Sequence, residues 1–154
     1  MNCFNVVEMG HVVTLIAPVS AGVALTSDIF SMANWEHASI IVSAGAGSGL
    51  TVTLYECVGF GATGATLIGY QYAQEEVAGG DTLGAALTAA GTGGVSMTSA
   101  SGIFMVIELD HDQLSDGYPC VRLNTSAAAA RLVGATAILS GGRYQEDITA
   151  TAIA

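Results

Sequence analysis

The densest group of side chains that could carry chemistry is an acidic run near residue 110. Glu108, Asp110, Asp112 and Asp116 follow one another closely, and His111 stands among them. Carboxylate oxygens at such spacings can bind calcium, but the run lacks the glycine and the final glutamate of an EF-hand loop. We therefore favour a solvated turn at the end of a strand, and the sequence predicts no metal site.

A glycine-rich segment at 59–64 reads Gly-Phe-Gly-Ala-Thr-Gly and matches the dinucleotide-binding pattern GxGxxG, with Asp81 as a candidate ribose-binding acid. That chemistry requires a helix to begin at the glycines, so that its N-terminus faces the pyrophosphate. Residues 65–72 instead contain Gly69 and alternate like a strand. The segment is therefore interpreted as a turn, and no cofactor is predicted.

The candidate nucleophiles and bases are scattered along the chain. Ser48 lies in a glycine-rich loop, one residue short of the nucleophile elbow GxSxG. His11, His37 and His111 form no recognisable catalytic pattern with a serine, a cysteine or a carboxylate. Glu36 precedes His37, but neighbours on a strand point to opposite faces. We predict that the protein is not an enzyme.

Three cysteines, Cys3, Cys57 and Cys120, lie far apart in the sequence. Their spacing matches neither a CxxC motif nor a zinc site. Small buried hydrophobic side chains are the simplest interpretation. A disulfide between two of the three remains open, and the sequence does not indicate which two would pair.

The composition favours assembly with other protein chains. Hydrophobic residues make up 51% of the chain, charged residues only 10%, and the mean hydropathy is +0.57. No apolar run reaches the roughly 18 residues of a spanning helix, so other proteins are expected to cover the apolar surface. The 13 Asp and Glu residues against 3 Arg give a net charge of -10, which disfavours nucleic acid and anionic membranes as partners.

Periodicity predicts strands along nearly the whole chain, because apolar and small residues alternate over short runs that end at Gly, Asn or Asp. The predicted strands span residues 12–16, 22–26, 37–44, 51–58, 66–73, 95–99, 102–110, 118–125 and 131–140. Helical turns are predicted at 82–90 and 112–115. The pattern predicts a single-domain all-β fold, an antiparallel β-sandwich of jelly-roll type with an extended N-terminal segment.

Residues 1–25 differ in character from the sandwich domain predicted at 26–154, because apolar side chains crowd both faces of the run at 12–16. The segment could be an arm laid across a neighbouring subunit or an ordinary edge strand of the same sandwich. The candidate interface residues are Val12, Val13, Leu15, Ile16, Tyr70, Tyr72, Arg131 and Arg143. Tyrosine and arginine are enriched at contact hot spots. No Lys or Arg precedes the apolar run, which argues against a signal peptide.

Several segments between residues 26 and 145 resemble the capsid decoration, or cement, proteins of tailed bacteriophages. They are SMANWEH (31–37) with the strands at 40–42 and 51–56, IELD (107–110) with Leu114, GYPCVRL (117–123) and AILSGGRY (137–144). The resemblance implies a β-sandwich subunit that forms trimers, in preference to dimers, on the outside of a shell built from a separate major capsid protein. It implies no catalytic residues, and it does not extend to the segment before residue 26.

Two functions are therefore carried forward. The first is a cement subunit, made in the host cytoplasm, that lies on the outer capsid surface of the virion and stabilises the shell. The alternative is a receptor-binding module of a phage tail, fibre or adhesin that uses the same sandwich to hold a host glycan. An enzyme would require a concave pocket with converging polar groups, which the sequence does not predict.

Overall fold

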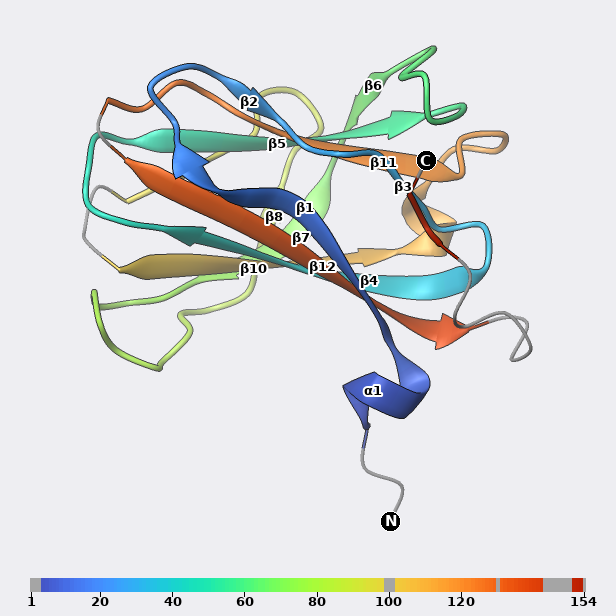
Figure 1. Ribbon diagram of the computed structural model, residues 1–154, viewed down its shortest axis with the longest axis horizontal. Coiled ribbons are helices and arrows are strands. Elements are labelled where there is room, and N and C mark those ends of the chain that lie inside the picture. The colour runs from blue at the N-terminus through green and yellow to red at the C-terminus, as the bar shows by residue number, and fades with distance from the viewer. Residues whose placement is uncertain (1–3, 99–101, 130, 143–150, 154) are drawn as a thin grey trace.

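The computed structural model describes residues 4–98, 102–129, 131–142 and 151–153. Two sheets pack face to face, and every strand pair among these residues is antiparallel (Figure 1). The short strands β3 and β9 lie beside the main strand order of the second sheet. The predicted all-β sandwich is therefore confirmed.

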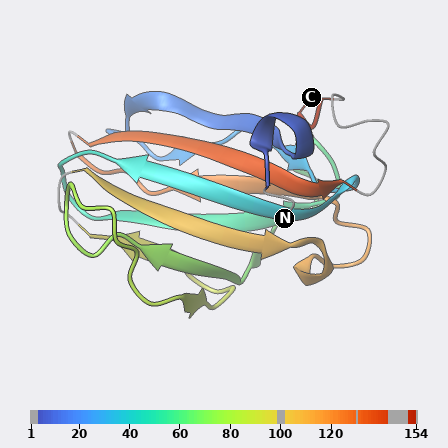
Figure 2. The ribbon, with the colours of Figure 1, turned by 90° about the horizontal axis from the view of Figure 1, so that it is seen from below.

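The first sheet contains six strands, and Figure 2 shows its long members side by side. Their spatial order is β1 (His11–Ser20), β12 (Leu132–Gly142), β4 (Trp35–Ala44), β10 (Ile103–Asp110), β7 (Tyr70–Gln74) and β8 (Leu87–Ala89). The second sheet runs β2 (Leu25–Thr26), β11 (Cys120–Thr125), β5 (Leu50–Cys57) and β6 (Thr66–Ile68). To these are added β3 (Phe30–Ser31) on β11 and β9 (Val95–Met97) on β5.

The core lies between the two sheets and follows from the alternation seen in the sequence. On β10, Met105 and Ile107 are fully buried, while Val106 between them faces outward. Ile40 on β4 is also fully buried, as are Leu54 and Leu123 from the opposite sheet. Because side chains alternate across a strand, each central strand gives one apolar row to this core and a second row to the outside.

The strand predicted at 66–73 is in fact two strands that belong to different sheets. β6 pairs with β5 in the second sheet, and β7 pairs with β10 in the first. The chain changes sheets at Gly69, where an added Cβ atom would lie 2.8 Å from the carbonyl oxygen of Ala89. Only glycine permits this close approach of two backbones, so the break is a consequence of Gly69.

The helical turn predicted at 82–90 is wrong. Leu83 forms an isolated bridge with Glu75, and β8 (Leu87–Ala89) pairs with β7. The open edge of β7 offers backbone hydrogen bonds that outweigh the weak helix propensity of this segment. The other predicted turn corresponds to a 3-10 turn, η1 (His111–Gln113), whereas α1 (Val6–Met9) and β3 were not predicted.

The N-terminal segment forms an edge strand of the first sheet. β1 pairs with β12 from His11 opposite Leu139 to Ser20 opposite Leu132. Of the two alternatives for this segment, the structure therefore has the edge strand and not a detached arm. Residues 1–3, 99–101, 130, 143–150 and 154 lie outside the described residues, including the end of the strand predicted at 95–99.

Candidate interaction face

The outward side of the first sheet is hollowed into a groove of about 750 Å³ that crosses β1, β12, β4 and β10. We call this hollow the groove. Its described lining residues are Thr14, Ile16, Pro18, Ile41, Ser43, Ala44, Gly45, Gly102, Ile103, Phe104, Leu132, Val133, Gly134, Ala135 and Thr136. The four strands that build it lie side by side in Figure 2.

Two local features make the sheet concave at this place. The register of β1 against β12 shifts on both sides of Ile16, and such bulges bend an edge strand away from a flat sheet. On β12, Gly134 has no side chain, and a Cβ atom added there would lie 3.4 Å from the Cγ of Pro18. The groove is therefore built from an irregular edge strand and small residues on its neighbour.

The chemistry of the groove suits binding. None of its described lining residues titrates near neutral pH, and Ile41, Phe104 and Leu132 contribute apolar surface. The Leu132 side chain is 61% exposed. Acid–base catalysis needs a titratable group within hydrogen-bond reach of the substrate, and this lining offers none. It offers apolar surface and the hydroxyl groups of Thr14, Ser43 and Thr136.

The same face of the sheet carries a polar cluster at the other end of β4 and β10. The His37 cluster consists of His37, Ser39, Glu108 and Asp110. His37 Nδ1 lies 2.6 Å from Asp110 Oδ1, and His37 Nε2 lies 2.7 Å from Glu108 Oε2. The Ser39 hydroxyl donates to Glu108 Oε2 at 2.7 Å. The register explains this arrangement, because Asp110 is opposite His37 and Glu108 is opposite Ser39.

The geometry of the His37 cluster fits a charged imidazolium. Both ring nitrogens face carboxylate oxygens, which accept hydrogen bonds, and only the doubly protonated ring donates from both nitrogens. Burial lowers the pKa of His37, but the hydrogen bonds and negative charges of Asp110 and Glu108 outweigh that effect and raise it. The Ser39 hydroxyl lies 3.3 Å from His37 Nε2 but donates to Glu108, so the cluster is arranged as an ion-pair network between His37 and two carboxylates.

The acidic run was predicted to form a solvated turn at a strand end. Its first two carboxylates, Glu108 and Asp110, belong to the His37 cluster, and the chain then enters the 3-10 turn. Gln113 closes the turn by accepting a hydrogen bond from the Asp110 backbone N–H at 2.8 Å. The described part of the chain contains no group of three or more His, Cys, Asp or Glu side chains arranged to hold a metal ion.

The turn interpretation of the segment 59–64 is confirmed. It connects β5 to β6, and Ala62 and Gly64 adopt positive φ angles of 56° and 67°. A strand follows these residues where a dinucleotide site would need a helix.

Most of the predicted interface residues at the N-terminus face the interior. Val13 and Leu15 are exposed by only 4% and 3%, so their side chains belong to the core and the interface prediction is corrected for them; Ile16 is 7% exposed. Ile16 also lines the groove wall. Val12 differs, because it points away from the core and is 54% exposed.

The two predicted interface tyrosines form a pair at the edge of the core. Tyr70 is 1% exposed, and its hydroxyl donates to the carbonyl oxygen of Val52 at 2.7 Å. Tyr72 is half-buried and meets the Tyr70 ring edge-on, with centroids 6.2 Å apart. Burial raises the pKa of the Tyr70 phenol. The interface prediction is therefore corrected for Tyr70, which connects the two sheets.

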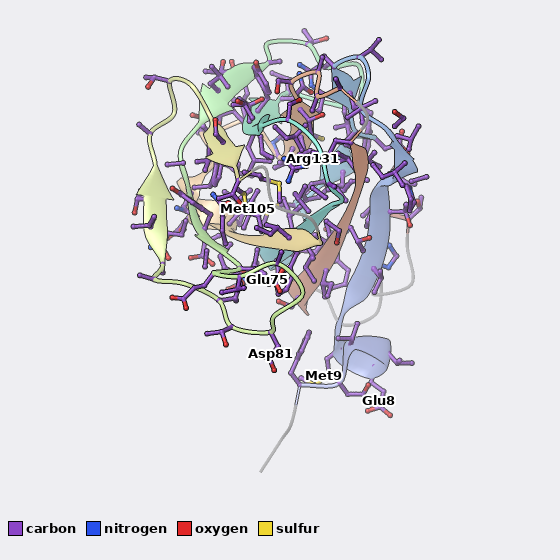
Figure 3. All side chains as sticks on the ribbon, turned by 90° about the vertical axis from the view of Figure 1, so that its left-hand side faces the viewer. Glu8, Met9, Glu75, Asp81, Met105 and Arg131 are labelled. Atoms are coloured by element: carbon purple, nitrogen blue, oxygen red, sulfur yellow. The ribbon has the colours of Figure 1, made fainter. Side chains whose placement is uncertain are left out.

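Arg131 is an internal residue, which corrects its predicted role at an interface. It is completely buried, and Figure 3 shows it among the side chains inside the sandwich. Its guanidinium donates to the carbonyl oxygens of Gly45 at 3.0 Å, Ser48 at 2.9 Å and Thr98 at 2.7 Å. Burial lowers the pKa of Arg131. Arg143, the other arginine predicted at an interface, lies outside the described residues.

Solved structures with a similar fold include one from a phage genome. The SPBc2 prophage-derived protein YomS is similar with a TM-score of 0.52 at 10% identity, over 86% of this chain and 93% of that chain. This similarity concerns the fold alone. RmlC from Streptococcus suis, solved in complex with dTDP-D-xylose, and the 4-keto-6-deoxy sugar epimerase NovW from Streptomyces spheroides reach TM-scores of 0.33 and 0.32, at 8% and 10% identity. These similarities cover 93% and 88% of this chain and 50% and 46% of those chains.

No protein-family model matches the sequence, and no curated protein is similar to it at a significant level. No helix among the described residues has the length and apolar character needed to cross a membrane.

Proposed function

We propose that the protein is a structural virion protein of the cement type, which docks on the outside of a bacteriophage shell and stabilises it. The groove carries this proposal, because it is an open and largely apolar hollow whose described lining has no titratable group. Each apolar side chain that a partner buries there contributes about 1.5–3 kcal/mol. The fold similarity to a prophage-derived protein supports a place in a phage particle.

Charge favours the major capsid protein over a second copy as the occupant of the groove. The chain carries a net charge of -10, and Glu108 and Asp110 lie on the same face as the groove. Arg131 is internal, and Arg122 lies on the second sheet over the Tyr55 ring. Two copies meeting through this face would bring like charges together, whereas a neutral or basic shell surface would complement it.

Self-association into trimers is proposed to use the two open edges of the first sheet. Val12 on β1 and Leu87 on β8 lie on opposite edges, and each is 54% exposed. A contact between unlike edges is heterologous, so it generates a closed ring when the rotation between copies allows closure. Such a ring would cover both edges and leave the part of the groove on β12, β4 and β10 open to the shell.

Cementing does not require tight binding by a single subunit. A protein that binds only the assembled shell stabilises it by mass action. A trimer that touches several capsid subunits gains further affinity through effective concentration. Shape and apolar contact are then sufficient, and no catalytic role is proposed.

The proposal is tested with shells from which this protein has been removed. Stripped particles are expected to burst at a lower temperature than complete ones, and adding the purified protein should restore the difference. Bursting temperatures that do not change would contradict the cement function. A copy number of a few per particle, confined to the tail, would favour the receptor-binding alternative.

The groove itself is tested with a charge placed inside it. Thr14→Glu introduces a carboxylate into the lining, and we expect binding to stripped shells to weaken at least about tenfold, because a buried unpaired charge is unfavourable. Thr92→Glu makes the same change on an exposed turn outside the lining and should bind normally. Equal binding by both variants would exclude the groove as the docking site. The cement function would then require another surface of the protein to contact the shell.

A further inference from the structure

Two of the three cysteines meet across adjacent strands. Cys57 is the last residue of β5, Cys120 is the first residue of β11, and the two are direct partners in the register. Both are buried, with exposed fractions of 0% and 3%. Both are free thiols. The sequence left the pairing of the cysteines open, and the register singles out this pair.

The Cα separation at this pair is compatible with a disulfide. The N–H of Ser126 donates to the carbonyl oxygen of Thr51, so these two residues are a hydrogen-bonded pair. Hydrogen-bonded pairs recur at every second position along two antiparallel strands. Counting along β5 and β11 from Thr51, Cys57 and Cys120 are also a hydrogen-bonded pair. The Cα atoms of such a pair lie about 5.5 Å apart. That separation falls within the range of about 4.4–6.8 Å found across protein disulfides. The Cβ atoms of a hydrogen-bonded pair lie about 5.5 Å apart and those of a disulfide about 3.5–4.5 Å, so these two strand ends have to shift toward each other to close the bond.

We propose that Cys57 and Cys120 are a modification site, at which a cross-strand disulfide forms in the presence of a small-molecule disulfide such as oxidised glutathione. One cysteine thiolate, having lost its proton, attacks the small disulfide, forms a mixed disulfide and expels one glutathione thiolate. The second cysteine, also deprotonated, attacks the mixed disulfide and expels the other. The protein loses two hydrogens and is oxidised, while one oxidised glutathione is reduced to two glutathione molecules.

The surroundings of the pair make this oxidation slow in the closed fold. Burial raises the pKa of both thiols, although Arg122 opposes the effect at Cys57 and a Ser31 hydrogen bond opposes it at Cys120. Only the thiolate attacks a disulfide, and a buried thiol also has to become accessible. Both cysteines lie at strand ends, so opening of this end of the second sheet is sufficient to expose them.

The bond would close a loop of about sixty residues between two strands of one sheet. A loop of that length predicts a rise of about 5–15 °C in the melting temperature, because cross-linking restricts the unfolded chain. The inference rests on the register of β5 and β11 and does not depend on the proposed function.

The test uses the full chain carrying Cys3→Ser, so that only the two paired thiols remain. The protein is partly opened in urea, incubated with oxidised glutathione, and returned to buffer. We expect a mass lower by two hydrogens with no glutathione adduct, a cross-linked peptide joining positions 57 and 120, and the higher melting temperature. Adding dithiothreitol should reverse all three changes.

The matched controls are Cys57→Ser and Cys120→Ser in the same background, which should acquire a glutathione adduct and no gain in melting temperature. Persistence of both thiols, addition of a glutathione to each, or a disulfide that lowers the melting temperature would overturn the proposal. If Cys3→Ser does not fold, the wild-type chain is oxidised instead and the linked peptides are mapped. A link through Cys3 in place of the proposed pair would also overturn it.

Discussion

Replacing Arg131 by methionine is expected to destabilise the protein strongly, although an exposed interface arginine would tolerate the change. Methionine keeps much of the length of the side chain and removes all of its hydrogen-bond donors. Three buried or half-buried carbonyl groups, those of Gly45, Ser48 and Thr98, then lose their guanidinium partner. That one guanidinium connects three segments of the chain, so its loss should lower the stability of the whole fold.

The magnitude follows from the three contacts. A hydrogen bond to a charged group contributes about 1.5–3 kcal/mol, so three contribute at most about 9 kcal/mol. Removing the guanidinium also removes the unfavourable free energy of burying its charge, which is several kcal/mol. We expect a net loss of about 3–5 kcal/mol in the free energy of unfolding, or roughly 6–20 °C in melting temperature.

Urea unfolding followed by Trp35 fluorescence measures this change, because Trp35 is 3% exposed in the fold and becomes solvated on unfolding. Arg122→Met is the matched control. Its guanidinium lies 5.1 Å from the Tyr55 ring centroid on the outward side of the second sheet, and its loss should change stability by about 1 kcal/mol or less. Equal stability of the two variants would refute the internal role of Arg131.

Three further predictions concern the Tyr70 pair, the His37 cluster and a strained turn. Tyr70→Phe removes the hydrogen bond to Val52 and should lower the free energy of unfolding by about 1 kcal/mol in urea titrations; no loss would mean that water replaces the hydroxyl. The raised pKa of His37 means that its ion pairs stabilise the fold below the ordinary value of 6.5 and stop doing so as pH rises through the raised value. Wild type should therefore exceed His37→Gln by about 0.5 kcal/mol at pH 5.5 and equal it at pH 9, and a difference that grows with pH would contradict this sign. Gly94→Ala should destabilise by about 2 kcal/mol more than Gly79→Ala, because both have φ of +72° but only the Cβ at Gly94 would meet the Val52 carbonyl, at 2.4 Å; equal melting temperatures would contradict that contact.

The sheet architecture could be predicted because its signal is local. The segment 102–110 alternates buried and outward side chains, and it forms β10 within one residue of the predicted bounds. The same local signal fails where the chain changes direction. Gly69 divides one apparent strand between two sheets, and nothing in the alternation around it indicates that division.

The candidate site depends on pairing between distant segments, and for this reason the sequence indicates it poorly. His37 meets Glu108 and Asp110 only because β4 and β10 are neighbours in one register. Residues of suitable type were noted in both segments, but a one-residue slip of that register would place them on opposite faces. Arg131 was missed for a similar reason, since its three carbonyl partners come from loops far away in the sequence.

The outward face of the first sheet separates two kinds of interaction that a docking protein could use. The described lining of the groove contains no charged side chain. The His37 cluster lies farther along the same strands, where His37 forms ion pairs with Glu108 and Asp110. Apolar burial in the groove would supply most of the affinity, and salt does not screen it as it screens the attraction between charges. The carboxylates would supply orientation and salt dependence, because they attract basic groups and repel another copy of this acidic chain. Salt should therefore weaken the binding of Thr14→Glu to the shell as it weakens that of the wild type. If the variant lost this salt dependence, the groove and the carboxylates would form one contact that supplies both the affinity and the salt dependence.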